Sequence, residues 1–207
     1  HWYANSNPQF TWDLPSSVTA VAFSINKDPQ GDSGPRSGGR ITTHTFNNVE
    51  DGKWYFHIQF KTSAGWGSIA HFPFNIDTSH PEKPYIFEII KKNVVQGDWT
   101  FKFLANDDLS GIDRYEIFVD NKKGEIQQGG GEHTYHIRGL FLGMHSLVIR
   151  AVDKAGNTST ETIRFGDVDG WNWLHTRNIV LAIFFALILF FFLKTRKKAG
   201  LSITKEY

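Results

Sequence analysis

The sequence contains no cysteine, one methionine and, before residue 171, no segment with a helical pattern. Without cysteine the chain has no disulfide, no thiol nucleophile, no thiolate metal site and no cysteine for lipid attachment. It also lacks a G-x-S-x-G string, a Walker phosphate loop and a pair of catalytic carboxylates, so we expect no catalysis and no catalytic residues. No basic stripe occurs outside the C-terminal tail, which argues against nucleic acid as a partner.

One long apolar run is present, and it lies near the C-terminus. Residues 179–193 read IVLAIFFALILFFFL, fifteen apolar residues without a charge or a proline. Basic residues flank the run, and two tryptophans precede it, where the aromatic belt of a membrane interface is expected. These flanking residues are Trp171, Trp173, Arg177, Lys194, Arg196, Lys197 and Lys198. The pattern predicts a transmembrane helix over residues 178–193, in contact with the lipid bilayer.

The basic flank predicts the orientation of this helix. Lys and Arg next to a spanning helix stay on the cytoplasmic face, so we expect the tail, residues 194–207, inside the cell and residues 1–177 outside the cytoplasm. Fifteen helical residues rise only about 22 Å, against a hydrocarbon core of about 30 Å. Arg177 and Lys194 can make up the difference by extending toward the interfaces. The alternative is a buried core helix, but such helices are usually amphipathic, whereas this run is apolar all round.

The two sides of the run differ in charge. The tail has five basic residues and one acid, which leaves 17 basic and 20 acidic residues before it and makes the outer region mildly acidic. The sequence starts at His1 without a basic and apolar leader, although an outer region requires export. We therefore expect it to be the C-terminal part of a longer precursor, with a further module upstream.

The outer region contains two similar blocks, residues 1–77 and 85–167, separated by a proline-rich hinge at residues 78–84. Apolar and glycine positions of the two blocks match at an offset of 91, and a segment in between matches at an offset of 94. Matching of this kind is typical of a tandem repeat. The matched pairs include Phe10 with Phe101, Phe56 with Leu147, Phe72 with Ile163, Phe74 with Phe165 and Val21 with Tyr115.

Apolar and polar residues alternate within each block, which is the periodicity of a β-strand. Turn signals containing glycine and asparagine separate the alternating runs. The pattern predicts an all-β fold of two antiparallel β-sandwiches with about seven strands each, then a juxtamembrane segment at residues 168–177 and the transmembrane helix. The expected inward positions are Trp54, Phe56, Ile58 and Phe60 in the first block and Leu147, Ile149 and Ala151 in the second.

The last hairpin of each block resembles known surface repeats. Residues 49–68 read VEDGKWYFHIQFKTSAGWGS, and residues 140–159 read LFLGMHSLVIRAVDKAGNTS. Both are similar to bacterial Ig-like and fibronectin type III-like repeats, as is DDLSGIDRYEIFVD at residues 107–120. The resemblance covers residues 8–167 and implies two tandem Ig-like antiparallel β-sandwiches, but it carries little information about function.

The same resemblance has further implications. Extracellular Ig-type domains of eukaryotes commonly contain a disulfide, so a chain without cysteine is more typical of bacteria or archaea. The arrangement also resembles the membrane-proximal end of cohesin-type envelope proteins from candidate-phyla bacteria. In one respect the chain departs from the type III pattern: the inward position that usually holds tyrosine carries Trp54 in one block and His145 in the other.

Two pairs of histidines are candidates for a metal site. His57 and His71 are expected to be cross-strand neighbours on the outer face of the first block, where two imidazoles could hold a metal ion. Because no third ligand has a fixed spacing, two solvated histidines are the favoured interpretation. His133 and His136 are expected on opposite faces of a strand, which argues against joint ligation. The sequence therefore predicts no metal ligands among the histidines.

Acidic loops offer a second metal hypothesis. Asp107 and Asp108, together with Asp153, could supply oxygen ligands to calcium, as could Asp28 and Asp32. None of these loops has the D-x-D-x-D-G spacing of a calcium loop, and Asp side chains commonly stabilise turns. We expect no cofactor, with calcium as the alternative.

Two aromatic residues are candidates for ligand binding. Trp66 is expected in a loop between Gly65 and Gly67, and Tyr55 is expected on the outer face of a strand. Either side chain could stack on a sugar, and either could instead form a contact between domains.

The favoured functional hypothesis is a non-catalytic, membrane-anchored extracellular stalk that displays an upstream module at the cell surface. The alternative is an adhesion module that binds envelope polysaccharide or a surface protein. A third hypothesis, a membrane-linked hydrolase, would require a catalytic domain before His1.

Overall fold

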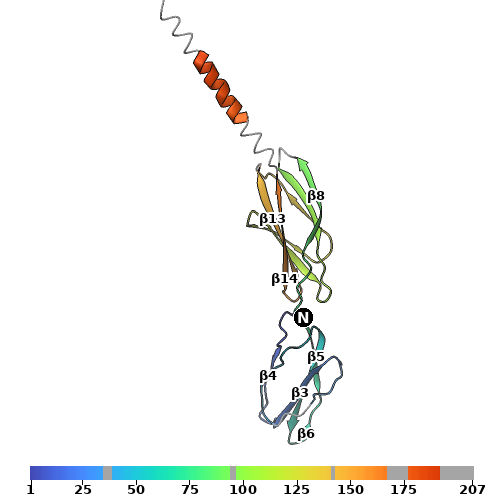
Figure 1. Ribbon diagram of the computed structural model, residues 1–207. Coiled ribbons are helices and arrows are strands. Elements are labelled where there is room, and N and C mark those ends of the chain that lie inside the picture. The colour runs from blue at the N-terminus through green and yellow to red at the C-terminus, as the bar shows by residue number, and fades with distance from the viewer. Residues whose placement is uncertain (35–38, 94–96, 141–142, 167–176, 192–207) are drawn as a thin grey trace, which may run out of the picture.

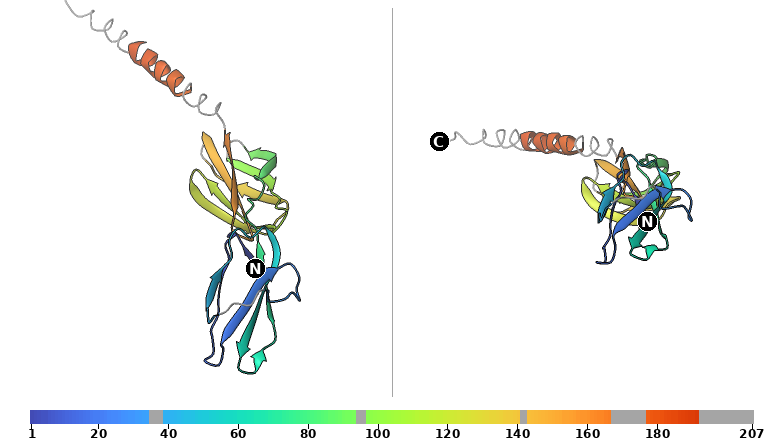
Figure 2. Two further views of the ribbon diagram at one scale, coloured as in Figure 1. Left: turned by 60° about the horizontal axis from the view of Figure 1, so that its bottom comes forward. Right: turned by 90° about the horizontal axis from the view of Figure 1, so that it is seen from below.

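The computed structural model describes residues 1–34, 39–93, 97–140, 143–166 and 177–191. Within these residues the chain forms two β-sandwiches, which lie end to end in Figure 1 and in the left view of Figure 2. Sandwich 1 contains strands β1 to β7, and sandwich 2 contains strands β8 to β14. The all-β prediction is therefore confirmed, as is the prediction of seven strands in each block.

Sandwich 1 has one large and one small sheet. The large sheet has the strand order β1-β7-β5-β3, with β6 also paired to β5, and the small sheet contains β2 and β4. The strands are β1 (Trp2–Tyr3), β2 (Gln9–Thr11), β3 (Ala20–Asn26), β4 (Thr43–Thr45), β5 (Gly52–Thr62), β6 (Gly65–Trp66) and β7 (Ala70–Ile76). Its buried core consists of Val18, Val21, Val49, Phe56, Ile58, Phe74 and Ile76.

Sandwich 2 has sheets of four and three strands. Their strand orders are β11-β10-β13-β14 and β12-β9-β8. The strands are β8 (Tyr85–Asn93), β9 (Asp98–Leu104), β10 (Ile112–Val119), β11 (Lys122–Gln128), β12 (His133–Ile137), β13 (Met144–Asp153) and β14 (Thr158–Gly166). Leu147, Ile149 and Ala151 are fully buried in its core, as the alternation predicts.

Five strands of each sandwich correspond to one another, as the repeat predicts. β2 and β4 pair with each other, and so do β9 and β12 at the matched positions. β3, β5 and β7 match β10, β13 and β14 in both order and register. Among the described residues, the strands without a counterpart of the same pairing are β1 and β6 in sandwich 1 and β8 and β11 in sandwich 2.

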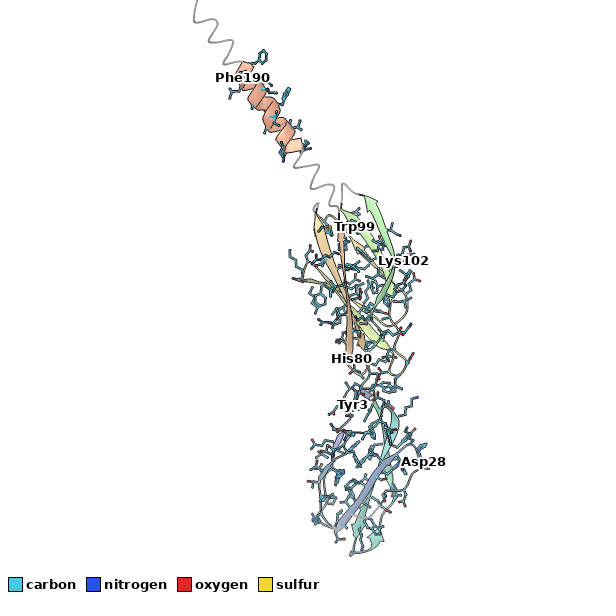
Figure 3. The ribbon with its side chains drawn as sticks, viewed as in Figure 1. Tyr3, Asp28, His80, Trp99, Lys102 and Phe190 are labelled. Carbon is cyan, nitrogen blue, oxygen red and sulfur yellow. The ribbon has the colours of Figure 1, made fainter. Side chains whose placement is uncertain are left out.

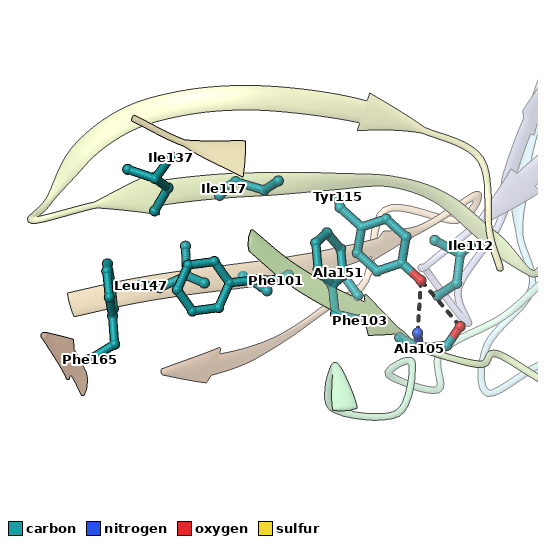
Figure 4. Packing of buried hydrophobic residues seen from close by; sticks show 11 residues of the cluster. Phe101, Phe103, Ala105, Ile112, Tyr115, Ile117, Ile137, Leu147, Ala151 and Phe165 are labelled. Atoms are coloured by element: carbon teal, nitrogen blue, oxygen red, sulfur yellow. Dashed lines mark hydrogen bonds between the residues drawn. The ribbon is translucent and has the colours of Figure 1, made fainter. Parts of the chain in front are cut away.

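A buried tyrosine ties two segments of sandwich 2 together. The Tyr115 hydroxyl accepts a hydrogen bond from the N–H of Ala105 at 2.8 Å and donates one to the carbonyl of the same residue at 3.3 Å (Figure 4). Burial raises the pKa of Tyr115, so the phenol keeps the proton that it donates. Type III domains usually hold a tyrosine at the positions that Trp54 and His145 occupy. In this chain the hydrogen bonds between a tyrosine hydroxyl and the backbone are made by Tyr115 instead.

A helix covers residues 177–191, and each of its residues is exposed. Phe190 projects from it into open space in Figure 3. Among the described residues, no helix combines the length and the apolar character needed to cross a membrane. The other residues predicted to flank a membrane lie outside the described residues. They are Trp171, Trp173, Lys194, Arg196, Lys197 and Lys198.

Candidate functional site

Asp77, which follows the last strand of sandwich 1, bonds to both sandwiches. Its carboxylate is fully buried and accepts hydrogen bonds from the N–H groups of Ser79 and Ser110, both at 3.1 Å. Its carbonyl accepts a hydrogen bond from the side-chain amide of Asn157 at 2.8 Å. Its own N–H donates to the carbonyl of Tyr3 at 3.0 Å. One residue therefore connects the first strand of sandwich 1 to two loops of sandwich 2.

Further hydrogen bonds hold the segment that follows Asp77. His80 Nδ1 lies 3.1 Å from the carbonyl of Thr158 and donates to it, and the Ser159 hydroxyl donates to the carbonyl of Pro81 at 2.5 Å. Figure 3 labels Tyr3 and His80 on the two sides of this region. We call residues 77–84, with the sandwich 2 loops that bond to them, the junction.

Three carboxylates meet at the junction. Oxygen atoms of Asp77, Asp107 and Asp153 all lie within 4.8 Å of one another. Asp153 Oδ1 accepts hydrogen bonds from the N–H groups of residues 155–157, and Asp107 Oδ1 accepts one from Gly111 at 2.6 Å. These donors explain why each carboxylate lies where it does, and an acidic cluster does not by itself identify a metal site. Calcium binding stays a prediction.

The other acidic residues of the calcium hypothesis lie apart from this cluster. Asp108 is exposed and does not belong to the group of three, although it is adjacent to Asp107. Asp28 and Asp32 belong to a loop of sandwich 1, where Asp28 Oδ1 accepts a hydrogen bond from the N–H of Gln30 at 2.9 Å. That bond stabilises a turn, which is the role that the sequence favours for Asp28.

His57 and His71 form a direct contact on the outer face of sandwich 1. They are register partners on β5 and β7, as predicted, and their Nδ1 atoms lie 2.7 Å apart. His57 is fully buried, so the prediction of two solvated histidines is wrong for this residue. The cause is local: His57 Nε2 faces the side-chain oxygen of Asn26 at 3.0 Å, on the neighbouring strand β3.

This geometry assigns the protons of the pair. Because the Asn26 oxygen can only accept, His57 Nε2 carries a proton and donates. In the neutral ring His57 Nδ1 is then an acceptor, and His71 Nδ1 donates to it. Burial, and next the nearby His71, lower the pKa of His57, while the carboxylates of Asp28 and Asp32 act in the opposite direction. His57 therefore resists taking up a second proton.

The second pair of histidines is separated, as predicted. The ring of His133 packs against Phe103 and Tyr115, with centroid distances of 6.0 and 4.7 Å. His136 is exposed, and its Nδ1 lies 2.9 Å from the hydroxyl of Thr100. The two imidazoles do not share a ligand position.

Trp66 and Tyr55 do not form one binding site. Trp66 lies in strand β6 rather than in the predicted loop; it pairs with Lys61, whose ammonium group lies 6.0 Å from the centroid of the indole. Tyr55 is on the same outer face of β5, with its ring 6.5 Å from that of His57. Six residues of extended strand separate Tyr55 from Lys61, a distance of about 20 Å. Each aromatic residue would have to bind a ligand separately.

Sequence reasoning missed Asp77 and the bonds across the junction. Asp77 bonds to Ser110 and Asn157, which lie 33 and 80 residues away in the sequence. The repeat pattern shows that two domains exist, but it contains no signal for a contact between them. The one available signal is that Asp77 directly precedes the proline-rich segment.

Comparison with known proteins identifies similar folds but no family. No protein-family model and no curated protein matches the sequence. Among solved structures, the fibronectin(III)-like modules of Clostridium thermocellum CbhA are 14% identical, with a TM-score of 0.49, over 80% of this chain and 86% of that one. The FN1–FN3 domains of chicken CNTN1 are 14% identical, with a TM-score of 0.43, over 80% of this chain and 64% of that one.

A third similar structure is the central fibronectin-III array of RIM-binding protein, at 12% identity and a TM-score of 0.28, over 77% of this chain and 63% of that one. These structure neighbours are fibronectin type III-like modules. Identities and TM-scores at this level do not assign the chain to a family.

Proposed function

We propose that this protein is a non-catalytic, membrane-anchored spacer, whose two sandwiches form an extended unit outside the cytoplasm. The observation that carries the proposal is the junction, where the buried carboxylate of Asp77 bonds to both sandwiches. A flexible linker between domains has few such bonds, because its backbone is solvated. A bonded junction instead favours a fixed spacing between the two ends of the unit.

The C-terminal helix supports the anchoring part of the proposal. Residues 177–191 expose apolar side chains on every side, and Phe191 is 69% exposed. Apolar side chains all round a helix are stable only when lipid or protein covers them. The basic residues that follow in the sequence favour lipid, with the tail on the cytoplasmic side.

The position of the N-terminus affects what such a spacer can display. His1 lies beside the end of β7, where its carbonyl accepts a hydrogen bond from the side chain of Asn75 at 3.2 Å. It therefore lies near the junction, and sandwich 1 extends beyond it (Figure 1). A module displayed from the N-terminus would sit beside the junction, and the loops next to β6 would form the free tip of the spacer.

Distance measurements between the sandwiches test the proposal. Because the chain has no cysteine, Ser63→Cys and Lys122→Cys introduce two spin labels without background. Ser63 lies on an exposed turn of sandwich 1, and Lys122 is the exposed first residue of β11 in sandwich 2. We expect pulsed electron resonance to give one narrow distance distribution for the full chain, and a broader one when Asp77→Ala is added. Asp108→Ala, an exposed acid two residues from Ser110, is the matched control and should leave the distribution narrow. A broad distribution in the otherwise unchanged chain would refute a fixed junction.

Carbohydrate or protein binding is the second candidate function. The geometry of Trp66 and Tyr55 does not favour a shared sugar site, because the two rings lie on separate parts of one face.

A further inference from the structure

A loop of sandwich 1 lies over the outer face of the large sheet. Residues 27–34 follow β3 and fold back onto it, where the Ser24 hydroxyl donates a hydrogen bond to the carbonyl of Asp32 at 2.6 Å. The loop also reaches β5, since the Ser33 hydroxyl donates to the side-chain oxygen of Gln59 at 3.3 Å and Ser33 is buried. We call residues 27–34 the flap.

The flap packs closely against β3. A Cβ atom at Gly31 would come within 2.3 Å of the side-chain nitrogen of Asn26, and one at Gly34 within 2.7 Å of the Ser24 Cβ. Glycine at these two positions therefore lets the backbone of the flap lie directly on the sheet. His57, the register partner of Ser24, projects from the same outer face and is nevertheless fully buried.

Asn26 connects the flap to the pair of histidines. Its side-chain oxygen accepts two hydrogen bonds, one from the N–H of Asp28 in the flap at 2.8 Å and one from His57 Nε2 at 3.0 Å. His57 Nδ1 in turn accepts a hydrogen bond from His71 Nδ1 at 2.7 Å. A chain of hydrogen bonds therefore runs from the flap through Asn26 and His57 to β7.

The contact between the two imidazoles needs one proton between the facing nitrogen atoms. The pair can take up one extra proton without breaking the contact, because a cationic ring still donates to a neutral one. A second extra proton leaves an N–H group on each of the facing nitrogen atoms, which lie 2.7 Å apart, and it places two positive charges side by side. The pair therefore tolerates one positive charge but not two.

The titratable groups around His57 lie on β7, on the flap and on its own strand. His71 is on β7, Asp28 and Asp32 are in the flap, and the ring of Tyr55 on β5 lies 6.5 Å away. Burial, and next His71, lower the pKa of His57, while the two carboxylates act in the opposite direction. When the flap opens, water reaches His57 and the burial penalty is lost, so the open state takes up protons more readily. Falling pH therefore favours the open flap.

We propose that the flap is an acid-operated latch, in which a second extra proton on the pair of His57 and His71 breaks the contact between the rings and releases residues 27–34. The strands stay paired, and the outer face of β3 and β5 that the closed flap covers becomes accessible. The flap is closed again when the pair loses that proton. The inference does not depend on the spacer role.

A spin label on the flap tests the latch. Because the chain has no cysteine, Gln30→Cys introduces one label at an exposed position of the flap in the full chain, held in detergent micelles. We expect the electron resonance spectrum to change from an immobile to a mobile label between about pH 7 and about pH 4, below the usual histidine pKa. In His71→Gln the transition should be lost, since a glutamine side chain can accept from a protonated His57 as well as donate to a neutral one. His136→Gln, at an exposed histidine of sandwich 2, is the control and should keep the transition.

A second measurement separates release of the flap from unfolding. Hydrogen exchange, compared with the intrinsic rate at each pH, should become at least about tenfold faster at residues 27–34 in acid, with protection of β3 and β5 retained. Ser33→Ala removes one bond of the flap and should move the transition to higher pH. The proposal is overturned if the label stays immobile until the whole chain unfolds, if the flap and the strands lose protection together, or if His71→Gln opens at the same pH as the unchanged chain.

Discussion

At the scale of single residues, His57 combines complete burial with a titratable ring. Burial and the adjacent His71 hold its pKa below the usual value of about 6.5, which applies to the unfolded chain. Between these two pKa values the unfolded chain binds more protons than the folded one, so acid favours unfolding. The stability that His57 contributes is complete above about pH 6.5 and is lost as the pH falls through the depressed pKa of the folded state.

The lowered pKa of His57 predicts how a substitution changes the pH dependence of the free energy of unfolding. We expect the free energy of unfolding, measured in urea at about pH 7.5 and about pH 5.5, to fall less with acid in His57→Gln than in the unchanged chain. His136→Gln, at an exposed histidine of sandwich 2, is the control and should keep the full dependence. Equal pH dependence in His57→Gln and in the unchanged chain would contradict the role assigned to the buried ring.

Residue contacts were predictable from the sequence only where they are local. The pairing of His57 with His71 follows from strand alternation within one hairpin, because 14 residues separate them across a short turn. The burial of His57 was not predictable, since it depends on Asn26, 31 residues away on another strand. The connecting role of Asp77 was missed for the same reason.

At the scale of elements, alternation predicts strands well and their environment less well. The inward face of β5 is confirmed, since Phe56 and Ile58 are buried. Phe72 has the same pattern but is exposed, because burial of a strand face depends on the sheet opposite. β6 was predicted to be a loop because a two-residue strand is too short to show any periodicity.

The hydrogen bonds between Tyr115 on β10 and Ala105, which directly follows β9, should stabilise sandwich 2. Tyr115→Phe keeps the packed ring but leaves the buried N–H of Ala105 without its acceptor. We expect a loss of about 1–3 kcal/mol in the free energy of unfolding of sandwich 2, measured by urea denaturation. Tyr85→Phe removes a hydroxyl from a residue that is 66% exposed and should change stability little. Equal stability of the two variants would show that the bonds to Ala105 contribute nothing.

At the scale of the whole molecule, the sequence shows two similar domains and an apolar C-terminal run, but not how the parts meet. The repeat offset gives the correspondence of strands because both copies bury the same alternating positions. The junction has no counterpart within either copy, so the repeat cannot predict it.

The anchoring proposal makes a prediction at this scale. Both buried cores lie within residues 1–166, so a fragment of those residues should stay folded, with unchanged unfolding midpoints, and should leave the membrane fraction.

In the full chain, Leu187→Lys places a charge near the middle of the apolar run, where the cost of lysine in a spanning helix is about 3 kcal/mol. We expect this variant to be extracted from membranes at alkaline pH, whereas the full chain resists extraction. Leu109→Lys makes the same substitution at an exposed leucine of sandwich 2 and should remain with the membrane. If Leu187→Lys and Leu109→Lys resist extraction equally, a feature other than the apolar run holds the chain to the membrane.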